Sequence, residues 1–278
     1  MSVTTVDFWV KSFDNTYLKC AKDLVNSPKA TILILHGLAE HYRRYDYIAS
    51  KFVANNFNVY RYDHRGHGDS DGKRGYVDDI HTFVKDLKII IDLVKEENQD
   101  LPLFVLGQGM GGHIMSIIGG EYDNLVDGMI FCSPLVCDFG NYTNCNYNEY
   151  DSDFDFVSAM NIHNLSHDYD FIQSYDEDEL VLKQVTVGIY NALKRSCSNI
   201  IEYLYKFKYP CLIFHGSMDT ITDCEDSRFL FNNIVSTDKE IRILNGLYHK
   251  LLEELSKDDI ILEISKWIES RIWLKREF

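Results

Sequence analysis

Short runs of aliphatic and β-branched residues alternate along the chain with segments whose apolar positions recur every three to four residues. The short runs predict strands, and the periodic segments predict amphipathic helices. Regular alternation of the two is typical of the α/β class, in which helices cover both faces of a mostly parallel central sheet. The predicted strands are Thr31–Leu35, Asn58–Tyr62, Leu103–Leu106, Gly128–Cys132, Cys211–Phe214 and Glu240–Leu244.

The strands are preceded by a predicted hairpin. Its arms are Val6–Val10 and Leu18–Cys20, and its turn is at Asp14-Asn15. Between the strands, four segments show apolar residues at helical spacing and predict helices that lie against the sheet. These segments are Tyr45–Asn55, Ile80–Glu97, Met110–Tyr122 and Leu255–Ile272.

The alternation stops between residues 138 and 208. This stretch of about 70 residues is too long for a plain connection between two strands, and we expect helices near Phe154–Met160 and Val185–Tyr205. Ten acidic residues lie between Glu149 and Glu179, and we expect them to form a solvated surface. The sequence therefore predicts a core of residues 1–137 and 209–278, with residues 138–208 inserted as a helical cap or lid.

Charge and composition exclude several classes of protein. The 278 residues carry a net charge of −15, which disfavours binding to nucleic acid or to an anionic lipid surface. The chain begins without a signal peptide pattern, and no apolar run is long enough to cross a bilayer. The seven cysteines have no paired spacing and are expected to be reduced. We predict a cytoplasmic protein without an integral membrane segment, and the oligomeric state is left open.

Glycines and polar residues follow five of the predicted strands. In a doubly wound sheet, the carboxyl ends of the strands form the ligand site, so these turns predict one shared site. One of them, Gly107-x-Gly109-x-x-Gly112, also matches the dinucleotide fingerprint of oxidoreductases. That alternative needs an acidic residue at the end of the next strand, but Asp127 lies at its beginning. A dinucleotide-binding oxidoreductase is therefore the less favoured hypothesis.

One histidine pair has the spacing of a helical metal site. His163 and His167 are four residues apart with acidic residues nearby, but the glutamate of a zinc protease is missing between them. We interpret them as surface histidines. No metal site and no cofactor are predicted.

The turn motifs resemble those of the α/β-hydrolases of the monoacylglycerol lipase and lysophospholipase type, the serine aminopeptidase S33 type. The resemblance covers about residues 30–135 and 205–270, and it implies cofactor-free hydrolysis of a carboxylic ester in a lipid. The block from Asp63 to Tyr76 is its most specific part. The matching motifs are His36-Gly37-x-x-Glu40-His41, Asp63-His64-Arg65-Gly66-His67-Gly68, Gly107-x-x-Met110-Gly111-Gly112, Ser133-Pro134, His215-Gly216-x-x-Asp219 and Tyr248-His249.

The resemblance also implies roles for single residues. Asp219 would be the acid and His249 the base of a catalytic triad, in the chain order of this fold. Their positions after two successive strands would let the carboxylate orient the imidazole above the sheet edge. The backbone N–H groups of Leu38 and Met110 would stabilise the oxyanion. The ligand would be a lipid ester or another fatty-acyl small molecule.

The chain departs from this family at the nucleophile. The family pattern Gly-x-Ser-x-Gly reads Gly107-Gln108-Gly109-Met110-Gly111 here, so Gly109 holds the position of the serine. Without a hydroxyl no acyl-enzyme can form. Ser116 lies too far along the helix and Cys132 on a neighbouring strand to replace it, and Gln108, where the family usually has histidine, is a second departure. We expect an inactive or nearly inactive protein, or alternatively a non-catalytic lipid-binding or scaffolding pseudoenzyme.

Overall fold

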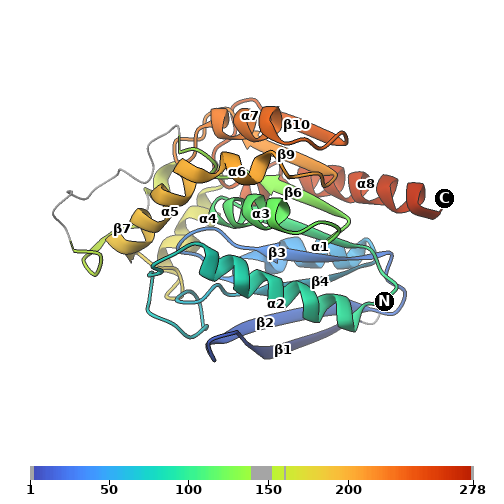
Figure 1. Ribbon diagram of the computed structural model, residues 1–278, viewed down its shortest axis with the longest axis horizontal. Helices are drawn as coiled ribbons and strands as arrows, with labels where there is room; N and C mark the ends of the chain where they lie inside the picture. Colours follow the sequence, from blue (N-terminus) through green and yellow to red (C-terminus); the bar gives the residue numbers. More distant parts are fainter. Residues whose placement is uncertain (1–2, 139–151, 160, 277–278) are drawn as a thin grey trace.

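A central β-sheet organises the molecule (Figure 1). The computed structural model describes residues 3–138, 152–159 and 161–276. Within them the sheet has eight strands. The six strands predicted after the hairpin are present with one or two residues added, except Gly128–Cys132, which is unchanged, and both arms of the hairpin are longer than predicted. The strands are β1 (Val3–Lys11), β2 (Tyr17–Val25), β3 (Ala30–Leu35), β4 (Phe57–Tyr62), β5 (Leu103–Gln108), β6 (Gly128–Cys132), β9 (Cys211–Gly216) and β10 (Lys239–Leu244).

The strand order is β1-β2-β4-β3-β5-β6-β9-β10. The first three strands in this order pair antiparallel, because β1 and β2 form the predicted hairpin and β2 lies against β4. All remaining neighbours pair parallel. Because parallel strands end at one edge, the turns that follow β3, β5, β9 and β10 meet there.

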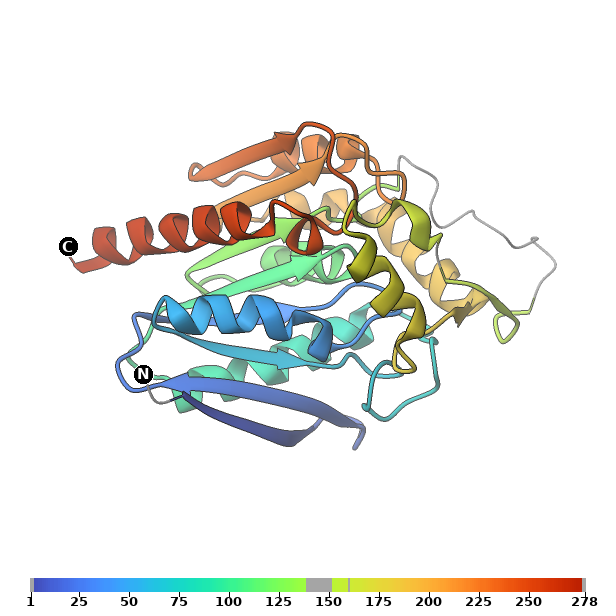
Figure 2. The same ribbon diagram turned by 180° about the vertical axis from the view of Figure 1, so that it is seen from behind.

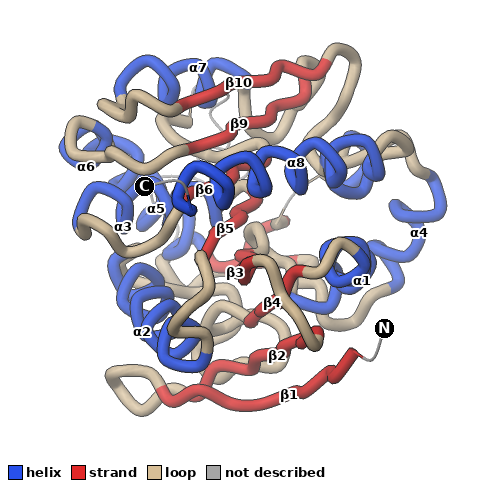
Figure 3. Tube along the Cα trace, turned by 90° about the vertical axis from the view of Figure 1, so that its right-hand side faces the viewer, coloured by secondary structure: helices blue, strands red, loops and turns tan. Residues whose placement is uncertain are grey.

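Helices cover both faces of the sheet (Figure 3). On one face, α1 (Asp46–Ala54) and α8 (Lys257–Arg276) bury Phe52, Ile264 and Trp267 against the strands. The opposite face is covered by α2 (His81–Glu97), α3 (Met110–Glu121), α6 (Ile201–Leu204) and α7 (Cys224–Asn233). The two apolar clusters are separated by the sheet. These layers confirm the predicted α/β class, in which helices cover both faces of a mostly parallel sheet.

The segment from residue 152 to residue 199, apart from residue 160, lies beyond the carboxyl edge of the sheet (Figures 1 and 2). It contains β7 (Phe156–Ser158), α4 (Tyr169–Glu177), β8 (Gln184–Thr186) and α5 (Val187–Asn199). Backbone hydrogen bonds from Leu182 to Ala39 and from Lys250 to Leu165 join it to the turns of the core. Its status as a separate cap, with the boundaries 138 and 208, stays a prediction.

Two helix predictions in this segment need correction. The predicted helix near Phe154–Met160 is wrong, because Phe156–Ser158 forms a strand that pairs antiparallel with Gln184–Thr186; Met160 lies outside the described residues. The predicted helix Val185–Tyr205 begins only after that strand and is divided at Ile200 into α5 and α6. Helix α4 was not predicted, although Asp168 caps it by accepting the Phe171 N–H at 3.2 Å.

Three expectations concern features of the whole chain. None of the described helices combines the length and apolarity that a membrane span requires. No cluster of three metal-ligating side chains occurs among the residues that the structure describes. The described cysteines are free thiols. Cys145 and two of the ten acids, Glu149 and Asp151, lie outside the described residues.

Candidate active site

Gly109 forms the sharp turn between β5 and α3. Its backbone has φ +52° and ψ −111°, a conformation that glycine adopts without the steric cost that a side chain brings. The N–H of Gly109 donates to the Cys132 carbonyl at 3.1 Å, and its carbonyl accepts from the N–H of Leu135, also at 3.1 Å. The turn is thus fixed to the neighbouring strand, and it points position 109 at the carboxyl edge of the sheet.

His249 and Asp219 meet at this edge. The Nδ1 atom of His249 lies 2.8 Å from Oδ2 of Asp219, and both side chains are almost fully buried. A Cβ at position 109 would lie 3.4 Å from Nε2 of His249, and among the described residues other than its chain neighbours it would meet only that ring within 4 Å. The turns after β5, β9 and β10 therefore bring together the three positions that the sequence analysis selected.

The carboxylate of Asp219 has more partners than the sequence indicated. Its Oδ1 accepts the N–H groups of Ile221 and Thr222 at 2.8 and 3.0 Å. Its Oδ2 also lies 3.2 Å from Nε2 of His215 and accepts the Thr222 hydroxyl at 3.0 Å. Burial acts to raise the pKa of Asp219, but the nearby imidazoles of His249 and His215 hold it below its ordinary value. The group is therefore an ionised acceptor for the ring of His249.

A small cavity separates the ring of His249 from the turn after β3. Its volume is about 10 Å³, close to the space of a single water molecule. Leu38, Gly109, Met110, His249 and Lys250 are among the residues that line it. Met110 is the first residue of α3, and the first N–H groups of a helix have no acceptor within it. Leu38 and Met110, the predicted oxyanion donors, thus border the same space as Gly109.

Gln108 contacts His249 from the end of β5. Its amide nitrogen lies 3.3 Å from ring Nε2 and 3.2 Å from the His249 carbonyl oxygen. Sequence reasoning noted Gln108 only as a departure from the family, and it gave no role to His215 or Thr222. The signal that the sequence offered for Gln108 was its position directly before Gly109, which holds the place of the nucleophile. The contacts of His215 and Thr222 with Asp219 depend on how the β9 turn folds, which the sequence does not show.

Buried charges lie behind the cavity. Lys250 is fully buried in direct ionic contact with Glu40, whose second oxygen accepts the Tyr45 hydroxyl at 2.8 Å. Burial lowers the pKa of Lys250 to about 7, and burial raises the pKa of nearby Glu253 to about 7. Glu40 belongs to the turn after β3, so its contact with Lys250 joins that turn to the turn after β10.

The Asp63–Tyr76 block serves the structure of its own loop. The Asp63 carboxylate accepts the N–H groups of Tyr42 and Asp69 at 2.7 and 2.8 Å. His64 donates its backbone N–H to Nε2 of His36 at 2.9 Å, and burial lowers the pKa of His64 to about 3. Burial also lowers the pKa of His36, so this pair of histidines is uncharged at neutral pH, and His36 begins the turn that contains Leu38. The most specific part of the motif pattern therefore builds the scaffold of the site.

The other candidate nucleophiles do not face His249. Burial raises the pKa of Cys132 to about 12, which leaves it a neutral thiol, the weakly nucleophilic form. Ser116 lies inside α3 and donates to the Gly112 carbonyl at 3.0 Å.

The residues of the two alternative hypotheses have structural contacts of their own. Asp127 lies at the start of a strand, whereas the dinucleotide hypothesis required an acid at its end, and it accepts the Leu103 N–H at the start of β5. His167 stacks on Tyr248 with a centroid distance of 4.0 Å and bonds to Glu254.

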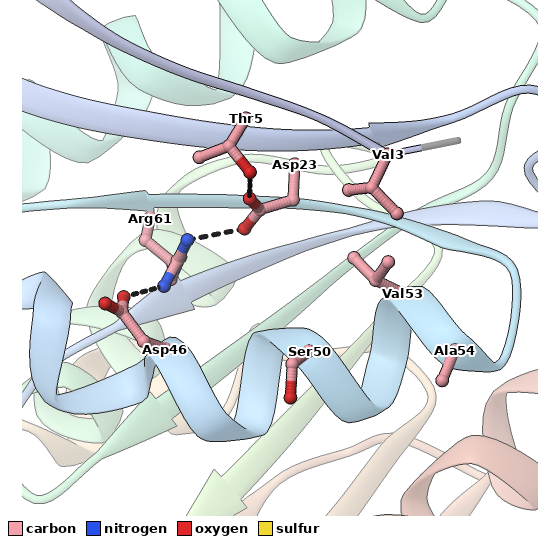
Figure 4. A pocket seen from close by; sticks show the side chains of 8 residues that line it. All are labelled: Val3, Thr5, Asp23, Asp46, Ser50, Val53, Ala54 and Arg61. Carbon is pink, nitrogen blue, oxygen red and sulfur yellow. Dashed lines mark hydrogen bonds and ion pairs between the residues drawn. The ribbon is translucent and has the colours of Figure 1, made fainter. Parts of the chain in front are cut away.

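A larger groove lies elsewhere, between helix α1 and the N-terminal hairpin (Figure 4). Its volume is about 750 Å³, and it shares no residue with the site described above. At its base the buried Arg61 pairs with Asp23 and Asp46. The full lining consists of Val3, Thr5, Asp23, Asp46, Ser50, Val53, Ala54 and Arg61.

Comparison with known proteins agrees with this geometry. A family model described as serine aminopeptidase, S33, matches residues 26–256. The chain belongs to this family. Human monoglyceride lipase is 30% identical over 277 residues, which cover 93% of this chain and 88% of the human protein. Monoacylglycerol lipase of Mycolicibacterium smegmatis is 28% identical over 262 residues, which cover 88% of this chain and 90% of that protein.

A solved structure shows the same fold as this chain. A soluble variant of monoglyceride lipase from Saccharomyces cerevisiae, in complex with a substrate analog, superposes with a TM-score of 0.84 at 18% identity. That match covers 95% of this chain and 94% of the yeast chain. The α/β-hydrolase fold and the membership of a monoglyceride lipase-like hydrolase family are thus confirmed.

Proposed function

We propose that this S33 family member binds the acyl ester of a lipid, of the monoacylglycerol or lysophospholipid class, and turns it over at no more than a background rate. The observation that supports the proposal is the arrangement at position 109. The ring of His249 faces a glycine there, at 3.4 Å from the point where a Cβ would stand. A base is in place, and the residue it faces has no group that can attack an ester.

The remaining parts of an acyl-transfer site have assigned roles in this proposal. Asp219 holds His249 with its proton on Nδ1, so that Nε2 carries no proton and is the nitrogen that could accept one. The N–H groups of Leu38 and Met110 would polarise an ester carbonyl once the cavity that both residues line, which has room for about one water molecule, has widened to admit it. Such donors bind an acyl group whether or not the reaction follows. In a serine protease of a different fold, removal of the catalytic serine costs about 2 × 10⁶ in kcat.

The class of ligand rests on the relatives. The chain covers most of the length of proteins named monoglyceride or monoacylglycerol lipase, from human and from Mycolicibacterium smegmatis. A single acyl chain on a small polar alcohol is the ligand that we carry over from them. The proposal requires neither a metal nor a cofactor.

The proposal is tested with the full chain and four variants. We expect the wild type, Gly109→Ala and His249→Gln to hydrolyse a long-chain monoacylglycerol equally slowly. Gly109→Ser should gain at least about a hundredfold and should react with a fluorophosphonate probe, because it restores the missing hydroxyl. Gly109→Ala is the matched control, since it adds a Cβ without a nucleophile. The double variant Gly109→Ser/His249→Gln should lose the gain.

Ligand binding is measured separately by calorimetry with a glyceryl monoether, which has no ester to cleave. We expect the wild type to bind it. Hydrolysis by the wild type that disappears in His249→Gln would contradict the loss of catalysis. Failure of Gly109→Ser to react with the probe would contradict the assignment of position 109, and absence of monoether binding would contradict the lipid ligand.

A further inference from the structure

The side chain of Gln108 has an orientation that its surroundings decide. The residue is 1% exposed, and its amide nitrogen lies 3.2 Å from the carbonyl oxygen of His249. A carbonyl oxygen can only accept, so the group that faces it must be the NH₂ and not the oxygen of the amide. The same NH₂ lies 3.3 Å from ring Nε2 of His249.

This orientation fixes the protonation of the ring. An NH₂ group has no lone pair to offer in a hydrogen bond, so Nε2 must be the acceptor and must carry no proton. The single proton of the neutral ring is then on Nδ1, where it is donated to Asp219 at 2.8 Å. Both ring nitrogens are therefore occupied, one by a carboxylate and the other by the amide of Gln108.

The amide of Gln108 makes the hydrogen bond to Nε2 of His249 that a nucleophile would otherwise make. In a Ser-His-Asp triad, the serine hydroxyl donates to Nε2 of the histidine. A Cβ at position 109 would lie 3.4 Å from this same nitrogen. A hydroxyl at position 109 and the NH₂ of Gln108 would thus compete for one lone pair of His249.

We propose that Gln108 is a positioning residue that takes the vacant hydrogen bond at Nε2, holds His249 as a neutral ring and withholds its lone pair from any hydroxyl at position 109. The inference rests on the proposed function only in assuming that position 109 lacks its nucleophile. The inference implies that Gln108 and Gly109 together keep the site inactive. Replacement of Gly109 alone gives a serine that is only partly activated.

The first test reads the ring directly and needs no activity. Side-chain ¹⁵N NMR of the full chain at pH 7 should show His249 protonated on Nδ1 and unprotonated on Nε2, with the signals assigned by their loss in His249→Gln. Gln108→Leu should shift the Nε2 signal by removing its donor. Gln108→Glu should place an acceptor opposite Nε2, so that the ring gains a second proton. The matched control is Gln173→Leu on the exposed face of α4, which should change neither signal.

The second test uses the rate of labelling by a fluorophosphonate probe. Gln108→Leu/Gly109→Ser should react about tenfold faster than Gly109→Ser, because one competing hydrogen bond is removed. The inference would be overturned if the two serine variants were labelled at equal rates and if neither Gln108→Leu nor Gln108→Glu changed the ring signals of His249. The proposed function would then still stand. Responsive ring signals without labelling of either serine variant would support the inference and overturn the assignment of position 109.

Discussion

At the scale of single residues, buried charges are tolerated where each has a partner. Arg61 is 4% exposed and pairs with Asp23, which is also buried, and with Asp46, which is largely exposed. The three residues come from β4, β2 and α1, so the ion pairs join the edge of the sheet to the helix above it. Removing the central cation would leave the carboxylate of Asp23 buried without a counter-charge.

Arg61→Met should therefore lower the free energy of unfolding by about 3 kcal/mol or more, because an uncompensated buried charge is costly. Asp46→Asn is the matched control and should cost about 1 kcal/mol or less, since the Asp46 side chain is 62% exposed. Urea denaturation of both variants measures the two values. Equal losses would show that the ion pair with Asp23 does not determine the effect.

At the scale of elements, α3 and α5 are joined by a buried histidine. His113 donates from Nδ1 to the Leu135 carbonyl at 3.2 Å and accepts the Ser196 hydroxyl on Nε2 at 2.7 Å. Both contacts suit a neutral ring, and burial lowers the pKa of His113 to about 4. In the unfolded chain the same side chain titrates near its ordinary value of about 6.5.

The free energy of unfolding should decrease as the pH falls, because His113 is buried as a neutral ring. Between about pH 6.5 and pH 4 the unfolded state binds a proton at His113 that the folded state does not, which destabilises the fold by about 1.4 kcal/mol per pH unit. His113→Gln should remove that part of the slope. Urea denaturation at several pH values compares the two proteins, and parallel profiles would contradict a neutral His113 in the folded state.

The elements also show how far the sequence analysis reached. Apolar runs predicted the strands of the main sheet, and glycine-rich turns predicted which positions would meet at its carboxyl edge. Prediction failed for β7 and β8, because strands of three residues carry no periodicity. Helix α4 was missed because its apolar face is narrow, with Phe171 and Tyr175 as its buried residues. The contact between Gln108 and His249 joins residues 141 positions apart and depends on the turn after β10.

At the scale of the whole molecule, acidic residues outnumber basic ones by 43 to 28. The resulting field repels anionic surfaces at distances within the screening length, which is about 10 Å at 0.1 M salt. A lipid ligand would therefore reach the chain as a dispersed molecule or from a neutral surface.

We expect no sedimentation of the protein with vesicles that contain phosphatidylserine, even at low salt, because the net charge opposes approach. Vesicles of phosphatidylcholine alone provide the reference. Binding that is specific to the anionic vesicles and is reversed by salt would show that a local basic surface overcomes the net charge of −15.

The left-handed backbone at Gly109 has a consequence for the evolution of such a site. Any residue with a side chain is strained in that conformation, typically by about 1–3 kcal/mol, whereas glycine is at ease there. A serine at this turn would thus be retained only at a cost in stability that glycine does not have. Stability and catalytic activity therefore make opposite demands on this one peptide unit, and relaxed selection for activity would favour glycine here.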